Sequence, residues 1–406
     1  MTAFLIYWRV LIETARRSQD AGSDLGSLII DARTLLRRSP GSSTPPLTPP
    51  AGAVWDTGPL PEINFSFPGS DISAMAYLGA LAPDIPSYQK GLFREKMIYG
   101  KRVPRSPDWA NILHVNRSGE MLRTLLEHIA NIPSPAVRSQ ALAFAMGYVS
   151  HIATDIALNP CINALAGAYR QSYRNRPIDI RSYIALCLDE YLAEQYFNHP
   201  LHTWTNQPWG HYIEPSARHM LHPGMLSAQV LNLLTSAAEA TYNLSEEQSR
   251  AFQQSYLAGL QPLRHYLAGR GVFRLLTFYA LTRNRTNDPI RASIVANSRG
   301  AGMVTFEEVI TYATRLSEHL CRRAIGYYAS LRNTQATAEE RNQRRRLLND
   351  DLRNWDLNTG YTMDVTFDEQ VTLHLVHNWV HFARFWEPEE GEDMRPFTSL
   401  TNSTST

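Results

Sequence analysis

The stretch Ala141-Leu-Ala-Phe-Ala-Met-Gly-Tyr-Val-Ser-His151-Ile-Ala-Thr-Asp155 is apolar over most of its length. A helix at the centre of a bundle has this composition, because every face of it contacts other helices. His151 and Asp155 lie four residues apart, which puts both side chains on one face with Cβ atoms about 5–6 Å apart. A buried carboxylate is costly without a cation or hydrogen-bond donors. The stretch therefore predicts either a hydrogen-bonded His–Asp pair or two ligands of one metal ion.

The composition sets outer limits on the kind of protein. The chain has 406 residues, of which 44% are apolar, so we expect one large helical body or two smaller ones. Lys and Arg number 39 and Asp and Glu number 38, so no strong field attracts nucleic acid, and we expect none as a partner. The three cysteines provide no disulfide framework and fit folding in a reducing cytosol.

Apolar residues recur at helical spacing along most of the chain, and strand alternation is scarce, so the predicted fold class is all-α. A first helical segment is expected within residues 3–38. The other predicted helices are Ile72–Leu81, Ser118–Asn131, Pro135–Asn159, Asp179–Phe197, Leu226–Ala240, Ser245–Gly259, Gly271–Arg285, Thr305–Arg332, Ala336–Asn354 and Phe367–Phe385.

Composition also divides the chain into segments. Seven prolines between Ser39 and Pro61 prevent a helix there, because proline lacks the N–H group and clashes with the preceding turn. Residues 1–38 are therefore an N-terminal helical segment and 39–61 a Pro-rich linker. Residues 62–270 form the core that carries the candidate site, 271–396 form a C-terminal helical extension, and 397–406 form a disordered tail.

Two further segments contribute candidate ligands. Leu78-Gly-Ala-Leu-Ala-Pro-Asp84-Ile-Pro is an apolar helix stopped by proline, with a carboxylate at the turn. Trp109-Ala-Asn-Ile-Leu-His114 places an imidazole just before the helix expected from Ser118. Together with His151 and Asp155, these segments supply two histidines and two carboxylates, a mixed nitrogen and oxygen set that suits zinc.

The ordered motifs resemble those of the zinc-dependent phospholipase C family, which shares its all-helical fold with the S1/P1 nucleases. The resemblance extends from Asp71 to about Phe197 and rests on Gly79-Ala-Leu-Ala-Pro-Asp84-Ile, on Trp109 with Leu113-His114, and on Gly147-Tyr-Val-Ser-His151-x-x-x-Asp155 followed by Asn159-Pro160. It implies a phospholipase C / P1 nuclease-like bundle with additional C-terminal helices.

The resemblance also implies a reaction, the hydrolysis of a phosphodiester in a phospholipid at a cluster of up to three zinc ions. The implied metal ligands are Asp84, His114, His151, Asp155 and Glu190, and Asp84 and Asp155 are the implied catalytic residues. A free carboxylate would serve as general base.

The chain departs from the family pattern at three places, and the number of zinc ions therefore stays open between one and three. It has no histidine before His114, it has Asn159 where the family often has histidine, and it has Leu186 where a His-x-x-x-Glu motif would end at Glu190. Two groups of histidines are candidate substitute ligands. The first is the five histidines between His199 and His222, and the second is His374, His377 and His381, which share one helix face. The alternative is a solvated, aromatic-rich connection for the first group and polar helix packing for the second.

Other functions and locations remain as alternatives. A nuclease of the same fold is one, and a non-catalytic effector or structural module with a degenerate metal site is another.

The N-terminus lacks the basic region and cleavage site of a signal peptide, and no run of about 18 uncharged apolar residues predicts a transmembrane helix. We expect synthesis in the cytoplasm and export, as a toxin or effector, by a dedicated secretion system. The expected partners are a phospholipid or membrane surface and a secretion-machine or carrier protein. The Phe4-Leu-Ile-Tyr-Trp8 cluster has two interpretations, contact with a membrane or carrier protein and, more common for such a segment, packing on its own domain.

Overall fold

A computed structural model describes residues 4–20, 71–90, 108–169, 180–195, 228–267 and 306–362. These residues are almost entirely helical, with one two-residue antiparallel strand pair, so the predicted all-α class is confirmed for the described part of the chain. The elements are α1 (Phe4–Asp20), α4 (Asp71–Gly79), the 3₁₀ helix η1 (Ala82–Lys90), α6 (Trp109–Val115), α7 (Ser118–Ala130), α8 (Pro135–Tyr169), α9 (Ile180–Gln195), α12 (Ala228–Tyr242), α13 (Glu246–Leu267), α16 (Phe306–Arg332), α17 (Ala338–Leu352), β1 (Trp355–Asp356) and β2 (Tyr361–Thr362).

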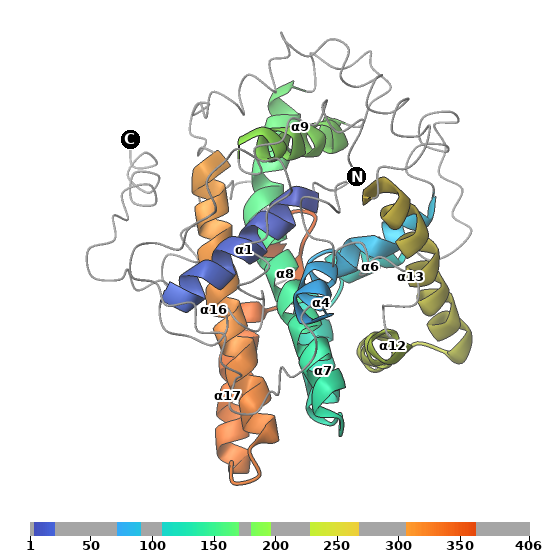
Figure 1. Ribbon diagram of the computed structural model, residues 1–406, viewed down its shortest axis with the longest axis vertical. Coiled ribbons are helices and arrows are strands. Elements are labelled where there is room, and N and C mark those ends of the chain that lie inside the picture. Colours follow the sequence, from blue (N-terminus) through green and yellow to red (C-terminus); the bar gives the residue numbers. More distant parts are fainter. Residues whose placement is uncertain are drawn as a thin grey trace.

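Helix α8 runs through the middle of the molecule, and the other helices surround it (Figure 1). Every residue from Ala141 to Ile162 is buried, as expected for a helix that is apolar on all faces. The span Pro135–Asn163 is long and apolar enough to cross a membrane by length and composition, but its most apolar 18-residue window is entirely buried inside the protein. Its composition is thus explained by its central position in the bundle.

The predicted end of α8 at Asn159 is wrong, because the helix continues through Pro160 to Tyr169. Proline at this position has no N–H group to donate to the carbonyl of Ile156, and a mid-helix proline usually costs about 3 kcal/mol. Gly360, in the β1–β2 turn, packs against this place with φ of 74°. A Cβ atom on Gly360 would lie 2.6 Å from Pro160 Cγ and 2.8 Å from Ile156 O. Tertiary packing around Pro160 therefore accompanies the continued helix.

The predicted helices that fall on described residues are present, and their starts lie within two residues of the observed ones. The predicted Ser245–Gly259 ends early, since α13 continues to Leu267. The short elements η1, α6 and the β1–β2 pair were not predicted, because each is too brief to display a periodic pattern. The predicted helices 271–285 and 367–385 lie outside the described residues.

Helix α1 packs against the core through buried polar contacts. The backbone N–H of Leu5, in its first turn, donates to Asp189 Oδ1 (2.9 Å), and Trp8 Nε1 donates to the carbonyl oxygen of Tyr77 (3.2 Å). Leu5 to Trp8 of the Phe4–Trp8 cluster are buried in the common core, which agrees with packing on the protein's own domain and not with contact to a membrane or carrier protein. The domain boundaries at 38–62 and 270–271 lie outside the described residues, so the proposed division stays a prediction.

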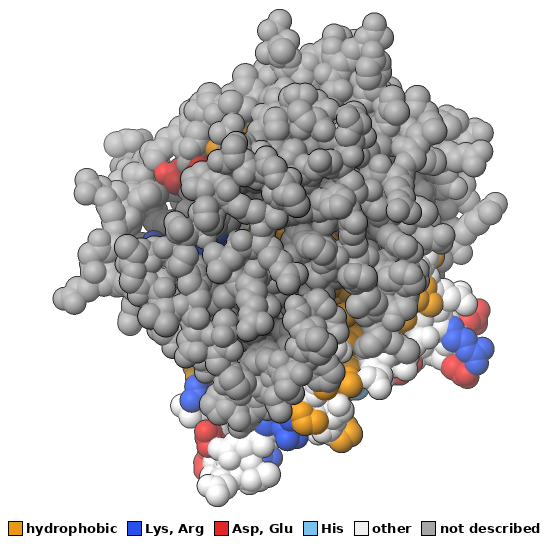
Figure 2. Space-filling model, in the orientation of Figure 1, with side chains coloured by type: hydrophobic (Ala, Val, Ile, Leu, Met, Phe, Trp, Pro, Cys, Tyr) orange, Lys and Arg blue, Asp and Glu red, His pale blue; other side chains and the backbone are white. Residues whose placement is uncertain are grey.

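Helices α16 and α17 extend the molecule beyond the end of α7 (Figure 1). Asp351 on α17 accepts from Arg323 Nε (2.7 Å) and lies 2.8 Å from His319 Nε2, both on α16. Among the side chains coloured in Figure 2, charged ones are visible along the lower edge of the molecule, near the α16–α17 turn and the α12–α13 turn. These charges lie at the surface of the bundle, away from the buried centre described below.

Two glycines bring α4 and α8 into close contact. A Cβ atom on Gly79 would overlap the backbone carbonyl of Phe144, and one on Gly147 would overlap the carbonyl oxygen of Ala76 and lie 2.6 Å from Ala80 N. The two helix backbones can approach this closely because neither position carries a side chain. This contact matters for the site, since the carbonyl of Ala80 lies at the end of α4 and binds a histidine of α8.

Replacing Gly147 by alanine is expected to lower the free energy of unfolding by about 1–3 kcal/mol, because the added methyl group forces two packed backbones apart. Gly326→Ala is the matched control. Gly326 also lies inside a helix, but an added Cβ would meet only Arg344 Nη1 at 3.6 Å. That substitution is expected to stabilise the protein by about 0.5–1 kcal/mol. Denaturant unfolding of both variants measures the difference, and equal effects would contradict the close contact.

Candidate metal centre

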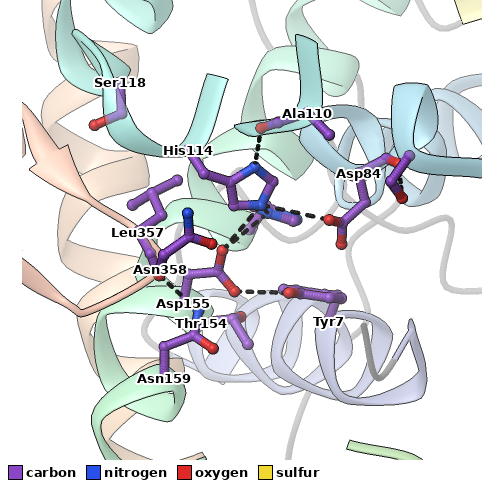
Figure 3. Close-up of polar contacts among 12 residues, drawn as sticks. Tyr7, Asp84, Ala110, His114, Ser118, Thr154, Asp155, Asn159, Leu357 and Asn358 are labelled. Carbon is purple, nitrogen blue, oxygen red and sulfur yellow. Dashed lines mark hydrogen bonds and ion pairs between the residues drawn. The ribbon is translucent and has the colours of Figure 1, made fainter. Parts of the chain in front are cut away.

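The structure brings Asp84, His114, His151 and Asp155 together at one buried point. Figure 3 shows Asp84, His114 and Asp155 pointing toward one another. Asp84 comes from η1, His114 from α6, and His151 and Asp155 from successive turns of α8. Each of the four residues is at most 5% exposed. The sequence predicted this meeting from the order of the motifs, and the described geometry agrees with it.

Local hydrogen bonds position Asp84 on η1 and His114 on α6, the two candidate ligands that lie on short elements. The N–H of Asp84 donates to the carbonyl of Leu81 (3.0 Å), which continues the turn that follows α4. Asp108 caps α6 by accepting from the N–H of Asn111. At the other end of α6, the N–H of Leu357 in the β1–β2 turn donates to the carbonyl of His114 (2.7 Å). The hairpin therefore helps to hold the helix that carries His114.

Backbone carbonyls fix the tautomers of both histidines. His151 Nδ1 donates to the carbonyl of Ala80 (2.8 Å), and His114 Nδ1 donates to that of Ala110 (2.6 Å). A carbonyl oxygen only accepts, so each Nδ1 must carry the hydrogen, and each neutral ring then has its lone pair on Nε2. The two Nε2 atoms lie 3.2 Å apart. Two lone pairs that face each other at this distance need a proton or a metal cation between them.

Carboxylate oxygens complete the cluster. Asp84 Oδ1 lies 3.4 Å from His114 Nε2, and Asp155 Oδ2 lies 3.3 Å from His114 Nε2 and 3.2 Å from His151 Nε2. Asp155 Oδ2 and Asp84 Oδ2 are nonetheless buried without a hydrogen-bond partner among the described residues. Buried polar atoms usually have a hydrogen-bond partner, so these two oxygens are candidate ligand atoms.

The spacing of these atoms fits one divalent metal ion. Two ligand atoms that each lie about 2.0–2.1 Å from one tetrahedral zinc ion are roughly 3.3 Å apart. The four contacts of 3.2–3.4 Å match this separation. Asp84, His114 and His151 each offer a ligand atom, and these three atoms lie within 4.8 Å of one another. Asp155, which contacts both imidazoles, is the neighbouring candidate for a fourth ligand.

Tyr7 of α1 is part of the site, although the sequence reasoning did not include it. Its hydroxyl donates to Asp155 Oδ1 (2.6 Å; Figure 3). Its ring stacks on His151 with centroids 4.3 Å apart and an interplanar angle of 10°. Tyr7 and Asp155 are 148 residues apart in the chain. No local spacing connects them, so only the packing of α1 against α8 reveals the contact.

The remaining predicted ligands have other positions. Glu190 lies on α9, but its side chain is outside the described part of the chain. The adjacent Asp189 is buried and accepts from the N–H of Leu5. Asn159, where the family pattern often has histidine, donates from Nδ2 to the carbonyl of Leu357 (2.6 Å), so its amide holds the hairpin. The histidines between 199 and 222 and those at 374, 377 and 381 also lie outside the described residues.

The two carboxylates change the acid–base properties of the neighbouring groups. Burial lowers the pKa of His114, but Asp155 and Asp84 outweigh it and raise that pKa from 6.5 to about 9. Burial raises the pKa of Asp155, but His151 and His114 outweigh it and hold that pKa far below its ordinary value. Burial, together with Asp155 and Asp84, raises the pKa of Tyr7 well above 10. At neutral pH Asp155 is therefore ionised and the Tyr7 hydroxyl is a donor.

Comparisons with protein families, with curated proteins and with solved structures gave no significant match to this chain. The resemblance to zinc-dependent phospholipase C thus rests on the ordered residues described above.

Metal uptake is expected to tighten as the pH rises toward about 9. His114 binds a metal through Nε2 only after losing its proton, and its pKa of about 9 means that a proton competes with the metal across the neutral range. Each pH unit below that value is expected to weaken apparent affinity by about tenfold per displaced proton. Titration with Zn²⁺ against a competing chelator, from about pH 6 to about pH 8.5, measures the slope. An affinity that levels off near pH 6.5, the ordinary imidazole value, would contradict this picture.

Proposed function

We propose that this chain is a metal-dependent phosphodiester hydrolase of the phospholipase C type, with phospholipid as substrate and zinc as the metal. The observation that carries the proposal is a set of four contacts of 3.2–3.4 Å inside an apolar core. They join the two Nε2 atoms to each other, both of them to Asp155 Oδ2, and His114 Nε2 to Asp84 Oδ1. A nitrogen and oxygen set of this kind suits zinc. The order of these residues along the chain resembles that of the phospholipase C family.

Each residue has a distinct role in the proposed reaction. His114 and His151 bind through Nε2, since their Nδ1 atoms are occupied by carbonyls. Asp155 is a ligand rather than a base, because its strongly lowered pKa makes it a poor proton acceptor. Asp84 turns Oδ1 toward His114 and has Oδ2 without a hydrogen-bond partner among the described residues, so Oδ2 can accept a proton from an attacking water. A bound divalent metal would polarise the phosphoryl group and stabilise the leaving oxygen.

A second candidate function is a non-catalytic module with a structural metal ion. It is favoured by the burial of all four side chains, none of which is more than 5% exposed. Structural zinc sites commonly use four protein ligands, whereas catalytic sites keep one coordination position open. If Asp155 completes a four-ligand set, the metal would stabilise the bundle without taking part in a reaction.

Substitution of one buried carboxylate separates these functions. Asp84→Asn is expected to reduce hydrolysis of phospholipid vesicles by about 100-fold or more, because it removes the proposed base and one ligand. The control is Asp351→Asn, which removes a carboxylate that is also buried but belongs to the α16–α17 contact. It is expected to retain hydrolysis. The measurements are metal content of the purified protein and release of the phosphorylated headgroup from mixed phosphatidylcholine and phosphatidylserine vesicles.

Chelation of the full-length protein distinguishes the remaining outcomes. Loss of hydrolysis with the metal, and recovery with added Zn²⁺, would support the proposed enzyme. A large fall in the thermal midpoint on chelation, without hydrolysis of any substrate, would favour the structural module. Cleavage of single-stranded DNA but not of vesicles would assign the site to a nuclease. A purified protein that contains no transition metal and takes up no added zinc would overturn the metal centre.

A further inference from the structure

Tyr7 contacts two of the proposed ligands at once. Its hydroxyl donates to Asp155 Oδ1 (2.6 Å), and its ring covers one face of the His151 imidazole at 4.3 Å. The side chain is buried, with 2% of its surface exposed. Since Oδ1 accepts from Tyr7, Oδ2 is the oxygen of Asp155 that faces the two imidazoles.

The packing of α1 fixes where Tyr7 lies. Two residues before Tyr7, the N–H of Leu5 donates to the buried Asp189 of α9. Two residues after it, Arg9 Nη1 donates to Glu307 Oε1 of α16 (2.9 Å). The helix is thus held on both sides of Tyr7 by elements that are far away in the sequence. A side chain held in this way can orient a ligand, as carboxylates and carbonyls do around metal-bound histidines.

We propose that Tyr7 is a positioning residue of the metal centre, which holds Asp155 so that a single oxygen faces the ion and which fixes the plane of His151. The inference rests on the proposed metal site, but it goes further by making the N-terminal helix α1 part of that site. A carboxylate bound through one oxygen occupies one coordination position. A carboxylate that is free to rotate can bind through both oxygens and occupy two.

Removal of the Tyr7 hydroxyl should therefore change both the affinity for the metal and the coordination geometry of the bound metal. Tyr7→Phe keeps the ring that stacks on His151 and removes only the donor to Asp155 Oδ1. Loss of a hydrogen bond to a metal ligand typically weakens metal affinity by about 10–100-fold. The orientation of Asp155 should change as well, and the absorption spectrum of bound Co²⁺ reports the resulting coordination geometry.

The matched control is Tyr148→Phe. Like Tyr7, Tyr148 is a buried tyrosine. It lies on α8, three residues before His151, and its hydroxyl has no hydrogen-bond partner among the described residues. Its removal is expected to leave both Co²⁺ affinity and the Co²⁺ spectrum unchanged. Circular dichroism and the thermal midpoint in chelator show whether each full-length variant is folded before the metal titrations are compared.

A double-mutant cycle tests whether Tyr7 affects metal affinity through Asp155. If Tyr7 acts on the metal through Asp155, then Tyr7→Phe should change Co²⁺ affinity by much less in an Asp155→Asn background than in the wild-type protein. A purely structural role of Tyr7 would lower affinity equally in both backgrounds and would leave the Co²⁺ spectrum unchanged.

The outcomes separate this inference from the proposed function. Co²⁺ binding by the wild type, with affinity reduced about 10–100-fold and an altered spectrum in Tyr7→Phe alone, supports the positioning role. Wild-type affinity and spectrum in Tyr7→Phe would overturn that role and leave the metal centre intact. Failure of the wild-type protein to bind Co²⁺ or Zn²⁺ would overturn the metal centre and the role of Tyr7 with it.

Discussion

The central constraint on this molecule is a group of lone pairs packed together inside an apolar core. Two imidazole nitrogens and two carboxylate oxygens lie 3.2–3.4 Å from one another in four contacts, and all four residues are buried. Burying such atoms is costly without a compensating positive charge. The surrounding structure does not separate them. Carbonyls orient both histidines, and a tyrosine orients one carboxylate, so that the lone pairs point inward.

Other parts of the fold hold these groups in place. The carbonyl of Ala80 reaches His151 because α4 and α8 pack closely at Gly79 and Gly147. The β1–β2 hairpin holds the carbonyl of His114 through Leu357, and Asn159 of α8 binds the same hairpin. Segments from the start, the middle and the end of the described chain therefore meet around a single centre.

The sequence predicted the parts of this arrangement that depend on local spacing. His151 and Asp155 lie four residues apart on an apolar helix, and that pattern alone indicates a shared face. Asp84 and His114 were found from the order of motifs and not from periodicity. Tyr7 and the hairpin were missed, because their contacts join residues more than 100 positions apart. The end of α8 was also missed, because tertiary packing around Pro160 overrides the local preference of proline.

The unpartnered oxygen of Asp84 bears on the choice between a structural and a catalytic metal. A purely structural site gains from satisfying every buried polar atom, and one left unpaired costs about 1–3 kcal/mol. Asp155 meets that expectation at Oδ1, where Tyr7 donates to it. Asp155 Oδ2 and Asp84 Oδ2 both have no hydrogen-bond partner among the described residues, but Asp155 Oδ2 faces the two imidazoles, whereas in Asp84 it is Oδ1 that lies near His114. An unpaired buried acceptor beside the proposed ligands is what a site needs if a water must be held and deprotonated there. If an ion takes up Asp155 Oδ2 and Asp84 Oδ1, Asp84 Oδ2 stays unpaired, and this difference favours the proposed hydrolytic function over the structural one.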